Sequence, residues 1–265
     1  MRVIAITGAS AGIGRATAVR LARQGDALVI CARRRDKLDA AAAEVRAGGG
    51  QALPVVADVT RLDDMERVVS LAIDHFGRLD VMICNAGYGV AGAIDEIPPA
   101  KMRDLMDVNY MGTYYAARAA LAVFRRQGSG HVVIVSSIVG KRGVPYMGAY
   151  SATKFAQAGM AECLRAEVSG SNIHVSVVYP VSTDTEFFEV MTRETGTRVT
   201  RAHGPRQDVA VTANAIARAI DRPVPEVFPH FPSRILVWVN AILPGLTDRV
   251  VKRFGRKPID GSRTP

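Results

Sequence analysis

Short, wholly apolar runs alternate along this chain with longer stretches in which apolar residues recur every three or four positions. Runs of the first kind are typical of parallel strands buried on both faces, and stretches of the second kind are typical of helices that bury one side. Strands are therefore expected at residues 3–6, 27–31, 52–56, 79–83, 131–135 and 173–178, with a short last strand within 225–231.

Helices are expected between these strands, at 15–24, 36–47, about 98–124, 150 to about 168 and 208–220, and one more that ends at residue 76. Asp36 is expected to cap the second of them, and Thr60 or Asp63 to cap the one that ends at residue 76. This alternation predicts an α/β fold, in which helices cover both faces of a doubly wound parallel sheet of about seven strands.

The composition suits one globular domain that spans residues 1–265. Hydrophobic residues make up 48% of the 265, and no stretch rich in Pro, Gly or Ser suggests a linker. The start of the chain lacks the order of a signal peptide, and no apolar run approaches the roughly 20 residues that span a bilayer. The formal charge of +9 is spread along the chain without interleaved aromatic residues. It therefore argues against nucleic-acid binding and favours an anionic cofactor or a lipid surface.

The cysteines and histidines give no sign of a metal site. Cys31, Cys84 and Cys163 lie in apolar surroundings without metal-ligand spacing, which is typical of reduced packing residues in a cytoplasmic protein. The histidines are scattered in the same way, so we expect no structural metal.

A glycine-rich turn follows the first strand. Gly8, Gly12 and Gly14 separate that strand from the first helix. Glycines there let the backbone come close to a ligand, and the free N–H groups of a helix start favour a phosphate. The turn therefore predicts a nucleotide site. After the second strand, where NAD-specific sites carry an acidic residue, the chain has Arg33 and Arg34, which favour the 2′-phosphate of NADP over NAD.

Tyr150 and Lys154 lie one helical turn apart, so their side chains share a face. A cation beside a phenol stabilises the phenolate and lowers the phenol pKa from its usual value near 10. Ser136 and Ser137 end the fifth strand, at the sheet edge where ligands bind. Asn109 lies inside a long predicted helix, where an asparagine often marks a local departure of the backbone.

Taken in order, these motifs resemble the short-chain dehydrogenase/reductase family over roughly residues 1–190. The resemblance rests on Thr7-Gly8-x-x-x-Gly12-Ile13-Gly14, Asp58-Val59, Asn85-Ala86-Gly87, Asn109, Ser137 and Tyr150-x-x-x-Lys154. It implies a Rossmann fold and transfer of hydride between a nicotinamide ring and a carbonyl or alcohol carbon. Val181 departs from the Pro-Gly that commonly follows the sixth strand in this family.

Four catalytic residues are implied by the resemblance. Tyr150 would be the acid/base, Lys154 would lower the phenol pKa and hold the nicotinamide ribose, Ser137 would orient the substrate, and Asn109 would position a water that links Lys154 to solvent. The implied cofactor-binding residues are Gly8, Ser10, Gly12, Ile13, Gly14, Arg33, Arg34, Asp58, Val59, Asn85, Ala86, Gly87, Tyr150, Lys154, Pro180, Thr183 and Thr185. Asp58 would meet the adenine amino group, and the turn from Asn85 to Gly87 would either line a ribose or hold the sheet together.

Two apolar stretches bear on the substrate. Residues 181–206 lie where family members keep a mobile lid, and residues 233–257 join an apolar run to basic residues. The second stretch could lie on a membrane surface, close the pocket, or pack in the core or at a subunit interface. We therefore expect an NADPH-preferring oxidoreductase of a steroid, retinoid or fatty-acyl compound, dimeric or tetrameric like its family. The alternative is a catalytically silent nucleotide-binding scaffold that binds a partner or membrane through its basic C-terminus.

Overall fold

A seven-stranded parallel sheet forms the centre of the molecule. The computed structural model describes residues 1–196 and 206–254, so parts of both apolar stretches, 197–205 and 255–257, lie outside the described residues. The strand order is β3-β2-β1-β4-β5-β6-β7, with every pair parallel. The strands are β1 (Val3–Thr7), β2 (Ala27–Ala32), β3 (Gln51–Val56), β4 (Val81–Cys84), β5 (Ser129–Val135), β6 (Asn172–Val178) and β7 (Glu226–Val227).

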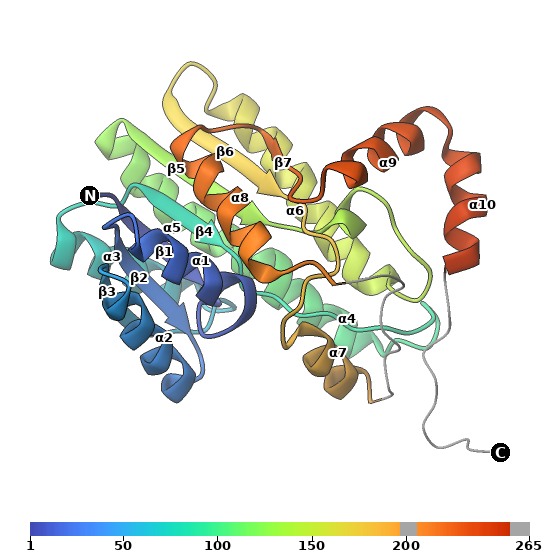
Figure 1. Ribbon diagram of the computed structural model, residues 1–265, viewed down its shortest axis with the longest axis horizontal. Helices are drawn as coiled ribbons and strands as arrows, with labels where there is room; N and C mark the ends of the chain where they lie inside the picture. Colours follow the sequence, from blue (N-terminus) through green and yellow to red (C-terminus); the bar gives the residue numbers. More distant parts are fainter. Residues whose placement is uncertain (197–205, 255–265) are drawn as a thin grey trace.

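Helices cover both faces of this sheet, as the sequence pattern predicts (Figure 1). On one face lie α1 (Gly12–Ala22), α2 (Arg35–Ala47) and α8 (Val209–Asp221), and on the other α3 (Leu62–Phe76), α5 (Gly112–Gln127) and α6 (Gly148–Glu167). Side chains of β1 alternate between the two cores, with Ile4 and Ile6 on the first face and Val3 and Ala5 on the second. The predicted doubly wound Rossmann fold is thereby confirmed.

The long helix expected at 98–124 is interrupted. It consists of α4 (Pro99–Met106), a π-helical turn η1 (Asp107–Met111) and α5. Asn109 lies in the π-helical turn, so the backbone departure that its presence predicted is found there. Two capping predictions are wrong: α2 and α3 follow Arg34 and Arg61, and neither is capped by a side chain. Thr60 instead donates to Asp58, with its hydroxyl 2.9 Å from Asp58 Oδ1.

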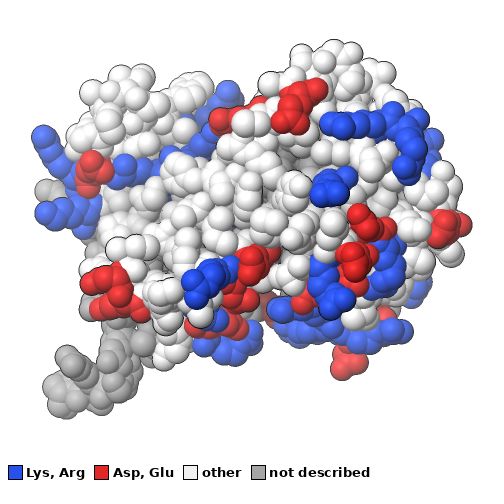
Figure 2. Space-filling view, turned by 180° about the vertical axis from the view of Figure 1, so that it is seen from behind, with Lys and Arg blue, Asp and Glu red and all other residues white. Residues whose placement is uncertain are grey.

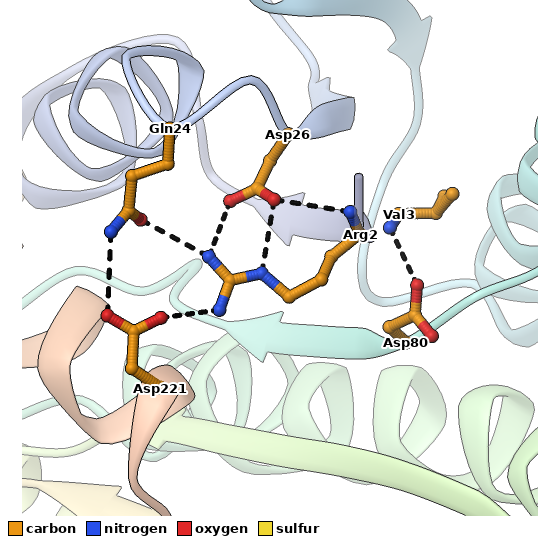
Figure 3. Close-up of polar contacts among 6 residues, drawn as sticks. All are labelled: Arg2, Val3, Gln24, Asp26, Asp80 and Asp221. Carbon is orange, nitrogen blue, oxygen red and sulfur yellow. Dashed lines mark hydrogen bonds and ion pairs between the residues drawn. The ribbon is translucent and has the colours of Figure 1, made fainter.

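A buried carboxylate anchors the start of the sheet. Arg2 donates to Asp26 from Nε (3.1 Å) and from Nη2 (2.8 Å), and its Nη1 reaches Asp221 on α8 at 2.6 Å (Figure 3). The backbone N–H of Val3 donates to Asp80 at 2.8 Å, just before β4. These contacts join the start of β1 to the starts of β2 and β4 and to α8, at the end opposite the glycine turn.

The C-terminal apolar stretch forms two helices, α9 (Phe231–Ile242) and α10 (Pro244–Phe254), which project from the body of the molecule (Figure 1). Exposed apolar residues repeat along one side of α9 at Phe231, Ile235, Trp238 and Ile242. These four residues therefore do not pack in the protein's own core, which was one of the predicted alternatives for this stretch. Within residues 1–196 and 206–254, no helix has the length and apolar character needed to cross a bilayer.

The cysteines divide into two kinds. Cys31 and Cys84 are buried in the strands, as expected, and burial raises the pKa of both thiols to about 12. Cys163 is exposed, so its prediction as a packing residue is wrong. It lies on the outer side of α6, whereas its apolar neighbours in the sequence, Ala161 and Leu164, face the core.

Candidate active site

The glycine turn brings backbone against backbone at the carboxyl end of β1. Gly8 has a φ of +67°, and a Cβ there would lie 2.8 Å from the Cα of Ala86. A Cβ on Gly14 would lie 2.6 Å from the carbonyl oxygen of Gly8. A side chain at Gly8 would push the turn after β1 away from the turn after β4, and one at Gly14 would push α1 away from the glycine turn. The glycines therefore keep the start of α1 close to β1 and leave its N–H groups open to a ligand.

Asn85 fastens this turn from β4. Its Nδ2 donates to the carbonyl oxygens of Thr7 (2.9 Å) and Gly8 (3.2 Å), and its backbone N–H donates to Thr7 Oγ1 (3.0 Å). Asn85, Ala86 and Gly87 also line the large cleft of the molecule. The two interpretations of this turn are therefore compatible, because the same residues join β1 to β4 and face the ligand space.

Basic side chains gather at one end of the cleft. Arg34 Nη2 lies 3.4 Å from Ser10 Oγ and forms an ion pair with Glu186, and Lys37 Nζ lies 2.6 Å from the same carboxylate. Glu186 directly precedes α7 (Phe187–Thr195), the helix of the predicted lid. The pKa of Glu186 is lowered, mainly by the hydrogen bond from Arg34. This end of the cleft thus offers cations to a phosphate but already holds one competing carboxylate.

Tyr150 and Lys154 lie at the other end, on the first turns of α6. Both side chains are buried, and Lys154 Nζ lies 5.6 Å from the centroid of the Tyr150 ring. Burial lowers the pKa of Lys154 to about 7, because desolvation disfavours the ammonium. Burial likewise raises the pKa of the Tyr150 phenol, which the Ser137 hydroxyl opposes by a hydrogen bond. A lowering of the phenol pKa by Lys154 would have to act against this burial.

Ser137 follows β5 by two residues and caps the short 3-10 helix η2 (Ile138–Gly140). Its hydroxyl oxygen accepts from the backbone N–H of Val139 at 3.3 Å. The neighbouring Ser136 instead donates to the backbone carbonyl of Lys154 at 3.0 Å, which fixes α6 against the strand. Of the two serines, Ser137 is the one that forms a hydrogen bond with the Tyr150 phenol.

Asn109 is fully buried behind the cleft. Its Nδ2 donates to the Tyr88 carbonyl (2.9 Å) and to Thr153 Oγ1 (3.0 Å), and its Oδ1 accepts from the Tyr88 N–H (3.0 Å). The side chain of Asn109 thus joins the segment after β4 that carries Gly87 to α6. Its backbone carbonyl accepts from Thr113 Oγ1 (2.8 Å) and from Gln157 Nε2 (2.7 Å).

The helix of the predicted lid, α7, lies against the Tyr150 phenol. The rings of Phe187 and Tyr150 have centroids 5.4 Å apart. The backbone N–H of Ala91 donates to Thr195 Oγ1 at 3.0 Å, and Lys101 Nζ lies 2.9 Å from Glu194. The described part of the predicted lid is therefore held against the cleft at both ends of α7.

One cleft of about 620 Å³ joins the two ends. Of the predicted site residues, it is lined by Gly8, Ser10, Gly12, Ile13, Arg33, Arg34, Asp58, Val59, Asn85, Ala86, Gly87, Ser137, Tyr150, Lys154, Pro180, Thr183 and Thr185. Gly14 and Asn109 do not line it: the first lies behind the glycine turn and the second behind Gly87. The cleft is basic at one end, has glycines along the turn after β1, and extends from Arg34 to Lys154. These features suit a dinucleotide. In the described part of the chain, no three His, Cys, Asp or Glu residues could hold a metal ion together.

Sequence reasoning missed two residues that contact this site. Gln157 lies three residues after Lys154, on the same helical face, and that spacing was the only available signal. Glu186 gave no signal, because its partners Arg34 and Lys37 are far away in the sequence.

The fold and the cleft define a nicotinamide-dependent oxidoreductase of the Rossmann type. A family model described as short chain dehydrogenase matches residues 2–196. The chain belongs to the short-chain dehydrogenase/reductase family, whose members typically act on small substrates and form oligomers.

Similar proteins agree with this membership. An uncharacterized oxidoreductase of Listeria innocua is 36% identical over 84% of this chain and 91% of its own length. A 3-ketodihydrosphingosine reductase of Bos taurus is 35% identical over 70% of this chain and 57% of its own length. An alcohol dehydrogenase of the archaeon Thermococcus sibiricus, solved with 5-hydroxy-NADP, superimposes with a TM-score of 0.77 at 28% identity, covering 86% of this chain and 95% of that one.

Proposed function

We propose that this protein reduces apolar carbonyl compounds with NADPH in preference to NADH. The observation that carries the proposal is the position of Tyr150, Lys154 and Ser137 at one end of a cleft whose other end holds Arg33 and Arg34. When bound, the nicotinamide cofactor supplies the hydride that reduces the carbonyl carbon. The reverse reaction, oxidation of an alcohol, would use the same residues.

Tyr150 is proposed as the proton donor to the carbonyl oxygen. Burial raises the pKa of its phenol, so the phenol keeps its proton at neutral pH until the substrate oxygen gains charge. Ser137 would donate a hydrogen bond to the same oxygen and orient the carbonyl. Lys154 would hold the nicotinamide ribose and, in its charged form, stabilise the phenolate that remains after proton transfer. Asn109 would support this arrangement by holding α6 and the Gly87 turn together.

The cofactor would lie along the cleft from Arg33 and Arg34 to Lys154. Gly8, Gly12 and the first N–H groups of α1 would hold its pyrophosphate. Arg34 would hold the 2′-phosphate, and Asp58 with Val59 would hold the adenine. The remaining cofactor contacts are proposed for Ser10, Ile13, Asn85, Ala86, Gly87, Pro180, Thr183 and Thr185.

An apolar substrate is proposed from the wall beside Tyr150. Apolar side chains there come from the loop before α6 and from the lid, and they are Val139, Val144, Met147, Phe187, Phe188 and Val190. A relative that is named for a keto substrate, the bovine 3-ketodihydrosphingosine reductase, supports a ketone with a fatty chain over a steroid or retinoid.

Turnover tests the proposal directly. Purified protein is mixed with NADPH and a panel of long-chain ketones, steroids and retinals, and loss of NADPH absorbance is followed. We expect turnover of at least one long-chain ketone, a loss of about 10²-fold or more in Tyr150→Phe, and no loss in Tyr114→Phe on the exposed face of α5. Nucleotide binding without turnover of any compound, unchanged by Tyr150→Phe, would support the alternative of a silent scaffold.

We also propose that α9 and α10 contact an anionic membrane surface from one side. Trp238 is 56% exposed and Ile242 76% exposed, and Arg234, Arg249 and Lys252 lie near them in the sequence. Lys and Arg side chains gather at the left edge of Figure 2, the side on which α9 and α10 project. An apolar stripe beside cations is suited to the interface of an anionic bilayer.

Liposome sedimentation tests this contact. The protein should sediment with vesicles that contain phosphatidylserine at low salt, less at high salt, and less after Trp238→Ser with Ile242→Ser. Absence of binding, together with a dimer that those two changes dissociate in analytical ultracentrifugation, would show instead that the stripe is a subunit interface. A homodimer or homotetramer that survives both changes would place the subunit contact elsewhere.

A further inference from the structure

Gln157 links three groups behind the proposed acid/base pair. Its Oε1 accepts from Lys154 Nζ at 3.0 Å, and its Nε2 donates to the Asn109 carbonyl and to Thr113 Oγ1, both at 2.7 Å. Gln157 and Asn109 are fully buried, and Thr113 is almost fully buried. A buried amide with every contact satisfied is held in one place.

The orientation of this amide follows from its neighbours. The ammonium of Lys154 can only donate, and a backbone carbonyl can only accept. Rotation of the amide by half a turn would set N–H groups against the ammonium and an oxygen against the Asn109 carbonyl. The amide therefore presents its oxygen to Lys154 and its nitrogen to Asn109.

Lys154 is thereby held from the side opposite the cleft. Its Nζ also donates to the backbone carbonyl of Val135 at 3.0 Å, so two of its three hydrogens are bound by protein oxygens. The third remains for the cleft, where the proposed ribose would lie. Loss of either acceptor would leave the ammonium free to turn.

We infer that Gln157 is a positioning residue for the acid/base pair, which fixes the Lys154 ammonium and itself makes the bridge to Asn109 that the family resemblance assigns to a water. This inference rests on the function proposed for Tyr150 and Lys154. A water can accept one proton and release another, whereas an amide oxygen is a very weak base. The bridge therefore transmits position, and protons reach Lys154 from the cleft side.

Few titratable groups face Lys154. Its Nζ faces the phenol of Tyr150 and the amide of Gln157 on α6 and the Val135 carbonyl at the end of β5. Behind Gln157 lie the Asn109 carbonyl of η1 and the Thr113 hydroxyl of α5, and neither of these titrates near neutral pH. Burial alone lowers the pKa of Lys154 to about 7. A change at position 157 should therefore be seen directly in the titration of this lysine.

The experiment follows the Lys154 side chain by NMR, in full-length protein labelled with ¹³C at the lysine ε carbon. Its resonance is assigned with Lys154→Arg, against Lys37, Lys101, Lys141, Lys252 and Lys257. Gln157→Leu removes an acceptor and should lower the titration midpoint by about one unit. Gln157→Glu adds a carboxylate and should raise it by at least as much. In turnover assays, the limb of the pH profile that reports Lys154 should move in the same two directions.

Gln127→Leu is the matched control. Gln127 also bridges backbone groups, donating to the Leu79 carbonyl (2.7 Å) and accepting from the Leu79 N–H (3.0 Å), but it lies at the far end of α5. Its replacement should leave the Lys154 midpoint unchanged. If Gln157→Leu does not fold, Thr113→Val removes one partner of the amide and should give a smaller downward shift.

An unchanged Lys154 midpoint in folded Gln157→Leu, or in Thr113→Val where that variant replaces it, would overturn the inference. A uniform loss of turnover at all pH values without a shift would show a structural role only. The NMR titration needs no substrate, so it decides the role of Gln157 even if no carbonyl compound is turned over and the proposed function fails.

Discussion

Arg34 forms an ion pair with Glu186 across the cleft, so the residue that precedes the lid helix α7 neutralises the cation proposed for the 2′-phosphate. Lys37 shares the same carboxylate, with its Nζ 2.6 Å away. Arg34 and Glu186 are both partly exposed, so their attraction is screened and modest. A bound phosphate and Glu186 would compete for the same two cations.

Replacement of Glu186 should therefore favour NADPH. We expect Glu186→Gln to tighten NADPH binding by about two- to fivefold, and Arg34→Ala to weaken it by about tenfold or more, with little change for NADH in either case. Isothermal titration calorimetry with both cofactors measures this. Arg35→Ala is the control, because Arg35 pairs with Asp39 outside the cleft. Equal affinity of the unaltered protein for NADPH and NADH would contradict the phosphate assignment.

Lys154 should make the stability of the fold depend on pH. Its pKa is about 7 in the folded protein, against a usual value of 10.5. Between these values the unfolded chain binds a proton that the folded chain does not, so a rise in pH favours the folded state. Below pH 7 the full cost of burying the ammonium is present.

Lys154→Met removes this contribution. Between pH 6.5 and about pH 9.5, the unfolding free energy of the unaltered protein should rise by roughly 3 kcal/mol relative to that of Lys154→Met. Urea unfolding of both proteins at both pH values measures this change. The two hydrogen bonds that Lys154→Met loses affect the difference in stability at both pH values, so they cancel when the two differences are compared. Lys252→Met, at an exposed lysine, should show no such shift. A constant difference for Lys154→Met would mean that this ammonium is not buried.

The sequence was sufficient for the fold and for most of the cleft. Short apolar runs such as Val3 to Ile6 are typical of strands buried on both faces, and parallel strands bring their carboxyl ends to one edge of the sheet. This geometry predicts that the glycine turn and Ser137 share one edge of the sheet, and the family resemblance adds Tyr150 to them. Helix starts were less predictable: α2 begins after Arg34 rather than at the predicted capping residue Asp36, and no side chain caps it.

Contacts between distant residues could not be predicted in the same way. Glu186 meets Arg34 only because the lid folds back over α2, and no local pattern encodes that path. Gln157 could be placed on the face of Lys154, but its bond to Asn109 depends on the π-helical turn that brings that carbonyl within reach. The sequence identified α9 as an apolar segment. It could not show that the apolar side of α9 is exposed, because that depends on how the helix packs against the rest of the protein.

Arg2 should be important for stability although it is far from the cleft. Asp26 is almost fully buried, and Arg2 supplies two of its hydrogen bonds from the guanidinium (Figure 3). Arg2→Leu would leave that carboxylate without a cation and should lower the unfolding free energy by about 3 kcal/mol, measured by urea unfolding at pH 7. Arg23→Ala, at a nearby exposed position, should change it by less than about 0.5 kcal/mol. Equal effects of the two changes would show that the Arg2 network contributes no more than an ordinary surface residue.

Phe187 should set the preference for apolar substrates. Its ring lies 5.4 Å from that of Tyr150 and belongs to the lid, so it would cover a chain bound beside the phenol. Phe187→Ala should raise KM for a long-chain ketone by about tenfold, because a buried aromatic contact of roughly 1.5 kcal/mol is lost, and should change KM little for a short ketone. Steady-state kinetics with ketones of increasing chain length measure this. Phe155→Ala, at an exposed position on α6, is the control and should alter neither value. A KM that rises equally for short and long ketones would show that Phe187 orients Tyr150 rather than binding the chain.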